Sequence, residues 1–327
     1  MTKNAFVTGA TGFIGINLVH LLVEKGWKVT ALHRPTSDLS YLKKLPVKLA
    51  MGSVTDFNSL SEAIPDDSEV VFHLAGDTNM WSQRNKRQAE INVDGTENMI
   101  RAAAQKDVQT FIHTSSVAAW GHVSGTVTEE TPQKGKVSWV NYEYTKWAGE
   151  QKALEGLQHN MKMVILNPSE VVGPYDSSNW GRLFFALRDG NLPAITNGCM
   201  SVTHVRSVVE AQLAAVEKGE SGENYILGGV NCRFSDLVKE VAAVSGHAHI
   251  PKQIPAVLFK TIGYLQAGLS YITQKEPDLT PELAHMMCRK DVRFSSEKAI
   301  NELDYHIAPL RQSVKDCYDW LKKERLL

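Results

Sequence analysis

The sequence has little cysteine. Its four cysteines, Cys199, Cys232, Cys288 and Cys317, are scattered and form neither a Cys-x-x-Cys pair nor a spacing typical of metal ligands. They indicate reduced thiols in a cytoplasmic protein with no metal site. The N-terminal residues run directly into a strand-like segment and lack the apolar core and cleavage site of a signal peptide, which favours the same location.

The sequence also lacks an excess of either charge and a long apolar run. Its 35 basic and 36 acidic side chains leave a net charge of −1, so nothing indicates a nucleic acid or a phospholipid surface as the main partner. The longest apolar stretch, residues 254–272, is interrupted by Lys260 and Gln266 and is too polar for a membrane span. It predicts a surface or interface helix and leaves weak membrane attachment open.

The first half of the chain alternates short apolar or β-branched segments with helical ones. Residues 12–26 and 90–105 are typical of helices. The strand-like segments are residues 4–8, 28–33, 47–51, 70–76, 110–116 and 162–167. Strands that alternate with helices predict an α/β fold of the Rossmann type, with a doubly wound parallel sheet covered on both faces.

The second half has a different composition. Gly, Asn, Ser and Pro become frequent after about residue 170, and helical segments dominate after residue 234. We therefore expect a cofactor-binding Rossmann domain over residues 1–170, to which later segments could return. Residues 171–327 would form mainly a smaller substrate-binding region and the C-terminal helices.

A glycine-rich turn follows the first strand. Gly9, Gly12 and Gly15 have the spacing G-x-x-G-x-x-G and open a helix. Gly9 allows a tight turn, Gly12 lets the backbone approach a pyrophosphate, and Gly15 permits close packing of helix on strand. Alone the motif also fits an ordinary turn, but its strand–turn–helix context predicts a dinucleotide site.

The end of the second strand distinguishes the two nicotinamide cofactors. An acidic residue there would accept a hydrogen bond from the adenosine ribose and would indicate NAD(H). This chain has Arg34 at that place, and a guanidinium can bind a 2′-phosphate through two parallel hydrogen bonds. Arg34 favours NADP(H) over NAD(H), and the alternative is a solvated surface arginine.

Two tyrosines lie close together in the segment NYEYTKWAGE, residues 141–150. Tyr142 has Lys146 four residues later, on the same face of a helix, whereas Tyr144 has Ala148. A phenol has an unperturbed pKa of about 10, and a nearby ammonium and an oxidised nicotinamide would both favour the phenolate. Tyr142 is therefore the candidate proton carrier, although a solvated helix face would show the same spacing.

Several further motifs accompany this pair. TGATGFIG (8–15), HLAG (73–76), NVDGTEN (92–98), SSVAAWG (115–121) and NPSEVVGP (167–174) occur in the order seen in the extended short-chain dehydrogenase/reductases. The chain resembles this superfamily over essentially its whole length. Arg34 followed by Pro, the form NPSxVVGP and ENYILGG (223–229) resemble the dihydroflavonol-4-reductase-like and 3β-hydroxysteroid-dehydrogenase-like branch.

The resemblance implies roles for individual residues. Ser116 would hydrogen-bond the substrate oxygen, with Ser115 the weaker candidate, while Tyr142 would be the acid/base. Lys146 would bind the nicotinamide ribose and tune the phenol, and Asn92 would support them. The implied cofactor contacts are Gly9, Thr11, Gly12, Phe13, Ile14, Gly15, Arg34, Ser53, Val54, Leu74, Ala75, Gly76, Tyr142, Lys146, Pro168 and Val171.

The resemblance is weaker at the substrate side. Ser53 stands where the family has an aspartate that contacts adenine, so this contact could pass to Ser53 or to the backbone of Val54. Trp120 stands where a tyrosine is common and could reshape the substrate wall. The candidate substrate contacts are Asp77, Met80, Trp81, Trp120, Glu170 and Trp180; Met80 and Trp81 could equally form a hydrophobic cap.

Three functions remain open at this point. The first is an NADP(H)-dependent oxidoreductase that reduces a ketone or aldehyde. The second is a nucleotide-sugar epimerase or dehydratase that retains bound NAD. The third is a non-catalytic redox sensor, which would have no need of a Ser/Tyr/Lys set. All three imply a small-molecule ligand, and the resemblance makes a homodimer possible.

Overall fold

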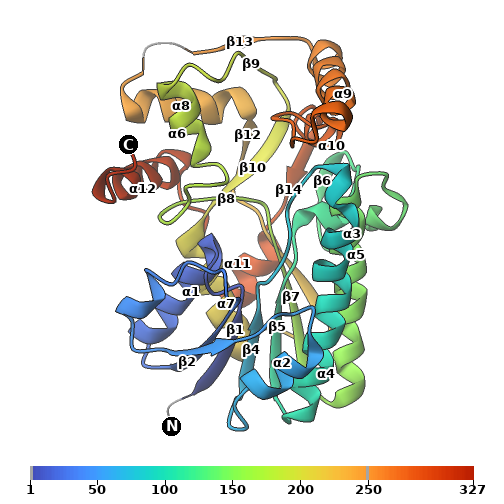
Figure 1. Ribbon diagram of the computed structural model, residues 1–327, viewed down its shortest axis with the longest axis vertical. Coiled ribbons are helices and arrows are strands. Elements are labelled where there is room, and N and C mark those ends of the chain that lie inside the picture. Colours follow the sequence, from blue (N-terminus) through green and yellow to red (C-terminus); the bar gives the residue numbers. More distant parts are fainter. Residues whose placement is uncertain (1–2, 248–249) are drawn as a thin grey trace.

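A seven-stranded parallel sheet forms the centre of the computed structural model, which describes residues 3–247 and 250–327 (Figure 1). The strand order is β11-β7-β5-β4-β1-β2-β3. The bounds are β1 Asn4–Thr8, β2 Lys28–His33, β3 Lys48–Met51, β4 Val70–His73, β5 Thr110–Thr114, β7 Lys162–Pro168 and β11 Glu223–Leu227. The sheet confirms the predicted α/β fold class.

The order of the strands reverses between β1 and β4. From β1 the chain winds outward to β2 and β3, and it then crosses back to β4, β5 and β7. Thr8 pairs with His73 at the carboxyl end of the two central strands. Loops diverge at such a switch point and leave a crevice, which is where open parallel sheets bind ligands.

Helices cover both faces of this sheet. One face carries α1 (Phe13–Glu24), α7 (Val205–Lys218) and α11 (Glu297–Leu303), and the other carries α2 (Phe57–Ala63), α4 (Gly95–Gln105) and α5 (Asn141–Leu154). Buried aliphatic residues of α1 and α7 form one core with the sheet, and those of α2 and α4 form the other. Burial on both faces explains why the strands are apolar almost throughout.

A smaller group of elements stands above the carboxyl edge. It contains a sheet of order β12-β10-β8, built from β8 (Glu170–Val172), β10 (Cys199–His204) and β12 (Val230–Arg233). Helices α6 (Arg182–Arg188), α8 (Phe234–Ser245) and α12 (Leu310–Lys323) pack around it. Between these segments the chain returns to the large sheet with α7, β11 and α11.

The remaining elements are short, with one exception. They are α3 (Asn85–Ala89), α10 (Pro281–Met286) and the paired strands β6 (Gly125–Val127) with β14 (Val292–Phe294) and β9 (Ala194–Ile195) with β13 (Lys252–Gln253). The exception is α9 (Ala256–Thr273), an 18-residue helix at the outer rim. Within residues 3–247 and 250–327, no helix has the length and apolar character needed to cross a bilayer.

Candidate active site

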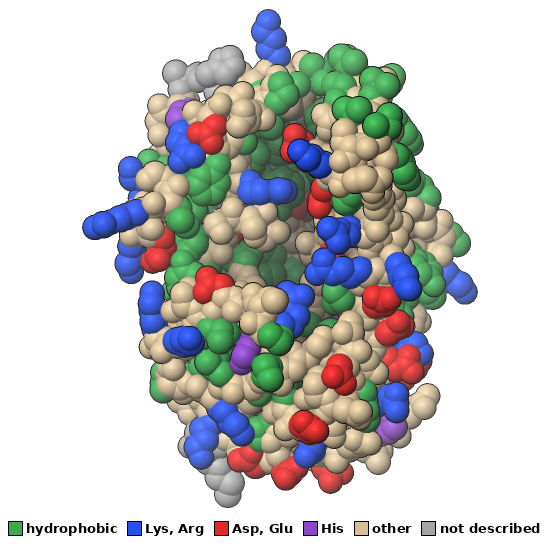
Figure 2. Space-filling model, in the orientation of Figure 1, with side chains coloured by type: hydrophobic (Ala, Val, Ile, Leu, Met, Phe, Trp, Pro, Cys, Tyr) green, Lys and Arg blue, Asp and Glu red, His purple; other side chains and the backbone are tan. Residues whose placement is uncertain are grey.

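The candidate site lies at the carboxyl edge of the large sheet. The ends of β1, β2, β3, β4, β5 and β7 all reach this edge because the strands are parallel. Figure 2 shows that this face of the molecule is hollowed between the sheet and the elements above it. Gly9, Arg34 and Ser53 follow β1, β2 and β3, and Leu74 and Ser116 follow β4 and β5.

The glycine turn after β1 leaves no room for side chains at two positions. Gly9 has φ +66°, and a Cβ there would lie 2.6 Å from the carbonyl carbon of Leu74. A Cβ at Gly15 would lie 2.1 Å from the carbonyl oxygen of Gly9. Gly12 is exposed at the N-cap of α1, where no described side chain caps the helix. The first N–H groups of α1 thus suit a phosphate, so the cradle fits a dinucleotide.

Helix α5 places Tyr142 and Lys146 together. The Lys146 Nζ lies 6.0 Å from the centre of the Tyr142 ring and donates a hydrogen bond to the Thr114 carbonyl oxygen at 3.4 Å. Lys146 is 8% exposed, whereas Tyr144 is 41% exposed and turns away beside Trp147. The i, i+4 spacing of the first pair therefore produces the arrangement expected from the sequence.

Burial shifts the pKa values of Tyr142 and Lys146. It raises the pKa of Tyr142 to about 12, against the opposing effect of the Ser116 hydroxyl. It lowers the pKa of Lys146 to about 8, against the opposing charge of Glu150. The cause in each case is that a buried site disfavours the charged form. In this structure the phenol is therefore a neutral proton donor throughout the neutral pH range.

The two serines after β5 lie on different sides of the chain. Ser116 is half-buried, and its hydroxyl lies close enough to the phenol to lower the Tyr142 pKa. It also accepts a hydrogen bond from Ala118 N–H at 3.1 Å. Ser115 is buried beside Glu150 and is among the groups that oppose the burial-driven rise of the Glu150 pKa. The geometry favours Ser116 as the serine that faces a substrate.

Asn92 connects the loop after β4 to helix α5. Its Oδ1 accepts a hydrogen bond from Asp77 N–H at 2.7 Å, and its Nδ2 donates to the Asp77 carbonyl oxygen and to the Thr145 hydroxyl. Asn92 lies in a π-helical turn, Glu90–Asp94, between α3 and α4. Such turns often mark functional sites, and here the turn directs the buried amide toward the loop. Asn92 positions the site through the backbone of Asp77.

The remaining candidate cofactor contacts follow the same edge. Arg34 is exposed just after β2, and Ser53 is half-exposed after β3, with its hydroxyl bonded to the Thr55 hydroxyl at 2.8 Å. Val54 is buried against Gly95, and its carbonyl oxygen accepts a hydrogen bond from Asn98. Half-buried Thr11, Phe13, Ile14, Leu74 and Ala75, exposed Gly76, and buried Pro168 and Val171 complete the set.

The candidate substrate residues divide into two groups. Asp77, Met80 and Glu170 are half-buried. Trp81 is largely buried and donates its indole N–H to the Ser270 hydroxyl of α9 at 3.2 Å. Trp180 is half-buried and packs 6.2 Å from the Phe234 ring.

Trp120 requires a correction. The sequence placed it on the substrate wall, but its side chain is 0% exposed and its indole N–H donates to the Thr131 carbonyl oxygen at 2.8 Å. It packs with Val127 and Phe294 in a small core beside β6 and β14. Trp120 therefore stabilises the fold and does not line the hollow.

Two buried carboxylates at the site were not predicted. Glu150 follows Lys146 by one helical turn, and Asn167 donates a hydrogen bond to it at 2.5 Å. Glu143 is fully buried and pairs with Arg289, whose charge also lowers the pKa of Glu170 against the larger effect of burial. The Lys146–Glu150 spacing was a usable sequence signal, whereas no local pattern connects Glu143 with Arg289.

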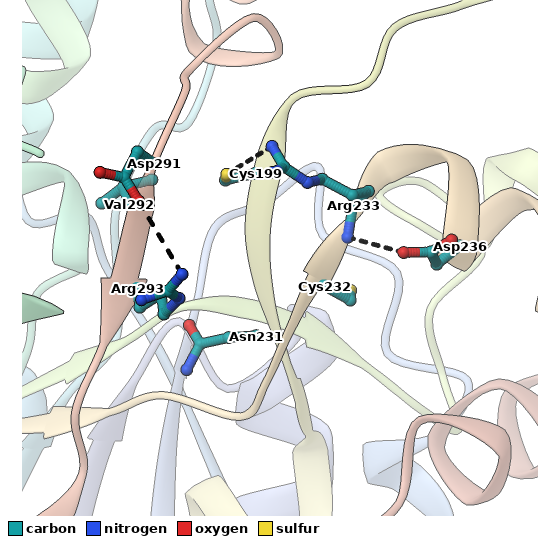
Figure 3. A pocket seen from close by; sticks show the side chains of 8 residues that line it. All are labelled: Cys199, Asn231, Cys232, Arg233, Asp236, Asp291, Val292 and Arg293. Carbon is teal, nitrogen blue, oxygen red and sulfur yellow. Dashed lines mark hydrogen bonds and ion pairs between the residues drawn. The ribbon is translucent and has the colours of Figure 1, made fainter. Parts of the chain in front are cut away.

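A separate pocket of about 250 Å³ lies among β10, β12 and β14 (Figure 3). Arg233 donates from Nη1 to the Cys199 sulfur at 2.9 Å, and its backbone N–H donates to Asp236. The full lining is Cys199, Asn231, Cys232, Arg233, Asp236, Asp291, Val292 and Arg293. This lining includes none of the site residues that the sequence singled out.

Comparison with known proteins identifies the family of this chain and supports its fold. A family model described as "NAD dependent epimerase/dehydratase family" matches residues 5–228. A putative dihydroflavonol 4-reductase of Synechocystis sp. is 28% identical over 325 residues, which cover 97% of this chain and 94% of the relative. The solved structure of gox2253 is 32% identical with a TM-score of 0.84 and covers 99% of both chains.

A third comparison shows the fold alone. The UDP-glucose 4-epimerase of Thermotoga maritima, solved with UDP-glucose, is 21% identical with a TM-score of 0.80. The alignment covers 99% of this chain and all of the epimerase chain. One backbone thus accommodates proteins named as reductases and proteins named as epimerases, so the choice between them depends on the side chains of the site.

Proposed function

Because this chain belongs to the NAD-dependent epimerase/dehydratase family and is an oxidoreductase, we propose that it reduces a ketone or aldehyde to an alcohol with NADPH. The observation that carries the proposal is the grouping of Ser116, Tyr142 and Lys146 at the carboxyl edge of the sheet. A redox sensor would not need a proton donor at this place.

The site residues can act on a carbonyl group in a simple way. A bound nicotinamide cofactor supplies the hydride that the carbonyl carbon accepts. Tyr142 donates its phenolic proton to the carbonyl oxygen, and Ser116 donates a hydrogen bond that stabilises negative charge developing there. Tyr142 is protonated at neutral pH, as reduction requires, although its raised pKa makes it a weaker acid than a free phenol.

Glu170 argues against a nucleotide-sugar substrate. Its Oε2 accepts a hydrogen bond from Ser201 N–H at 3.0 Å, and burial raises its pKa. Arg206 is not available to neutralise this carboxyl group, because it pairs with Glu24 and Glu210. Arg182 donates instead to the Asn179 carbonyl oxygen.

The nearby cation is Arg289, which already pairs with Glu143. A diphosphate placed beside Glu170 would therefore lie next to a carboxyl group whose neighbouring cation is already paired. With Glu170 ionised, the like charges would oppose association. With Glu170 protonated, the form that burial favours, there is no repulsion, but the cation beside it, Arg289, is already paired with Glu143. Both forms support an uncharged, moderately hydrophobic carbonyl substrate over a nucleotide sugar.

Substrate assays test this choice directly. We expect NADPH consumption with members of a panel of hydrophobic ketones and aldehydes, and no calorimetric signal with uridine or thymidine diphosphate sugars. The variant Glu170→Gln removes the charge at constant size and tests whether the carboxylate is what excludes the diphosphate. Micromolar sugar-nucleotide binding without carbonyl reduction would favour an epimerase, and NADPH binding without any turnover would favour a sensor.

Cofactor preference gives a second prediction. Arg34 is exposed at the end of β2, and we expect it to make NADPH bind more tightly than NADH. Arg34→Ala should weaken NADPH binding by about 10- to 100-fold, the equivalent of one hydrogen bond to a charged group, and should leave NADH binding nearly unchanged. Fluorescence titration of both cofactors measures this, with the exposed Arg311→Ala as the control. Equal or stronger NADH binding by the wild-type protein would contradict the assignment.

A further inference from the structure

Glu150 is a buried carboxylate that the proposed reaction does not use. It is 1% exposed and lies on α5, four residues after Lys146 and eight after Tyr142. Steps of four residues place the three side chains along one face of the helix. A glutamate is almost never fully buried unless it is paired. In residues 3–247 and 250–327, however, its oxygens meet amide groups and no lysine, arginine or histidine within salt-bridge distance.

Three neutral amides hold this carboxylate. Gln133 Nε2 donates to Oε2 at 2.7 Å, Asn224 Nδ2 donates to Oε2 at 3.1 Å, and Asn167 Nδ2 donates to Oε1 at 2.5 Å. An ionised carboxylate only accepts hydrogen bonds, whereas a protonated one would point its own O–H at one of these donors. The three amides therefore suit the ionised form, and they oppose the rise in pKa that burial causes. They bring no positive charge, so the negative charge of Glu150 can act on a nearby cation.

The nearby cation is the ammonium of Lys146. It is buried, it donates to the Thr114 carbonyl oxygen at 3.4 Å, and it forms no salt bridge with any residue that the structure describes. Burial favours the neutral amine, and the charge of Glu150 opposes that effect. The phenol of Tyr142 on the same helix face is protonated in the neutral range and adds no negative charge.

The titratable groups that face Lys146 from the neighbouring strands do not replace Glu150. His73 of β4 and His113 of β5 are buried, and burial lowers both of their pKa values, that of His73 to about 3. Both imidazoles are therefore neutral at neutral pH. In the loop after β4, Asp77 pairs with Arg87 at 3.7 Å. These groups add no unpaired negative charge beside the ammonium.

The same amides connect Glu150 to the serine of the candidate site. Asn167 lies on β7 and is fully buried, and its Nδ2 also donates to the Ser116 carbonyl oxygen at 3.2 Å. Its Oδ1 accepts a hydrogen bond from Asn224 Nδ2 at 3.0 Å, which fixes the orientation of the amide. The carboxylate of Glu150 thus holds the amide that holds the backbone of Ser116.

Given the carbonyl reduction proposed for this site, we propose that Glu150 is a positioning residue for it. From one turn further along α5 it keeps the Lys146 ammonium charged, and through Asn167 it holds the backbone of Ser116 in place. Glu150 itself contacts no reacting atom. The charged ammonium stabilises the negative charge that develops on the phenol as Tyr142 gives up its proton.

Carbon-13 NMR of the whole protein, labelled at the ε-carbon of lysine, measures the charge of Lys146 directly. The Lys146 signal is the one that is missing from the spectrum of Lys146→Met. We expect this signal to titrate at about pH 8 in the wild-type protein. In Glu150→Gln the midpoint should fall by about one pH unit, the order of effect of one neighbouring opposite charge. An unchanged midpoint in Glu150→Gln would overturn the proposal.

Glu155→Gln is the matched control. It makes the same chemical change just after α5, at a half-exposed side chain that pairs with Lys152 at 3.0 Å. The Lys146 midpoint should stay where it is in the wild-type protein. An equal fall of the midpoint in both variants would show that Glu150 has no particular role and would also overturn the proposal.

The pH dependence of turnover separates positioning from a purely structural role. In Glu150→Gln the alkaline limb of kcat/KM should move to lower pH together with the NMR midpoint. Turnover that is lost equally at every pH, with the limb unmoved, would contradict the proposal. The NMR titration needs no turnover. A lowered midpoint without any carbonyl reduction would therefore support the role of Glu150 toward Lys146 and contradict the proposed function alone.

A second variant serves if Glu150→Gln does not fold, which unfolding measurements would show. Gln133→Leu/Asn224→Leu removes two of the three amides that donate to the carboxylate. The protonated form of Glu150 is then favoured, so the Lys146 midpoint should again fall. A midpoint equal to that of the wild-type protein in this folded variant would overturn the proposal.

Discussion

Replacing Tyr142 by phenylalanine is expected to reduce carbonyl reduction by about 10² to 10⁴-fold, the usual contribution of a positioned proton donor. The ring, its packing and the nearby ammonium of Lys146 would remain, so NADPH affinity should be nearly unchanged. Only the proton that the carbonyl oxygen needs would be missing. Steady-state kinetics with a ketone or aldehyde that the wild-type enzyme reduces would measure turnover. A fluorescence titration with NADPH would measure binding separately.

Tyr144→Phe is the matched control for this experiment. It makes the same chemical change two residues away on the same helix, at a side chain that is 41% exposed and turned from the site. Its turnover should stay within a few-fold of wild type. Equal activity of the two variants would show that the phenol of Tyr142 carries no proton in the reaction.

The large sheet could be predicted from the sequence because its signals are local. The segments expected at residues 4–8, 28–33 and 110–116 became β1, β2 and β5 with few changes at their ends. A strand buried on both faces is a continuous apolar run, which stands out between amphipathic helices. The edge strand β11 was not assigned in this way, since Glu223–Leu227 begins with two polar residues.

The pairing of Tyr142 with Lys146 was predictable for a similar reason. A spacing of four residues places two side chains on the same face of a helix, independently of the rest of the chain. The placement of Trp120 depended on packing against Val127 and Phe294, which are near it only after β6 and β14 have paired. A tryptophan near a strand end can line a cavity or fill a core, and the sequence around it does not decide which.

The ion pair of Glu143 with Arg289 is the clearest feature that the sequence could not predict. The two residues are separated by 146 positions, and both are almost completely buried. Glu143 directly follows Tyr142, so the pair connects helix α5 to the segment between α10 and β14. A charge on a helix face is normally solvated, and only the tertiary structure shows that this one is enclosed and neutralised.

Lys146→Met is expected to inactivate the enzyme and to stabilise it. The ammonium lies 6.0 Å from the centre of the Tyr142 ring. Its loss should reduce carbonyl reduction by on the order of 10²-fold, as removal of one charge-stabilising group typically does. Burial of the Lys146 ammonium, however, destabilises the folded protein. The pKa is lowered from 10.5 to about 8 by desolvation, and a displacement of this size corresponds to about 3 kcal/mol.

The sign of the stability change follows from the proton affinity of Lys146, which is weaker in the folded state than in the unfolded state. The folded-state pKa lies below the unfolded-state value, so the charged lysine destabilises the folded protein fully below about pH 8. The penalty declines as the pH rises from 8 to 10.5, above which both states carry a neutral amine. Lys146→Met should therefore raise the free energy of unfolding by about 2 to 3 kcal/mol at pH 7 and by little above pH 10.

Denaturant unfolding at a series of pH values measures this gain, and kinetics with the same preparations measures the loss of turnover. Lys152→Met, on the same helix, is the control: Lys152 is paired with Glu97 and Glu155, which raise its pKa, so removing it should bring no gain at pH 7. A Lys146→Met protein that is less stable than wild type at pH 7, or whose gain persists above pH 10, would contradict the prediction. It would mean that the contacts of the ammonium with the Thr114 carbonyl and Glu150 outweigh its desolvation.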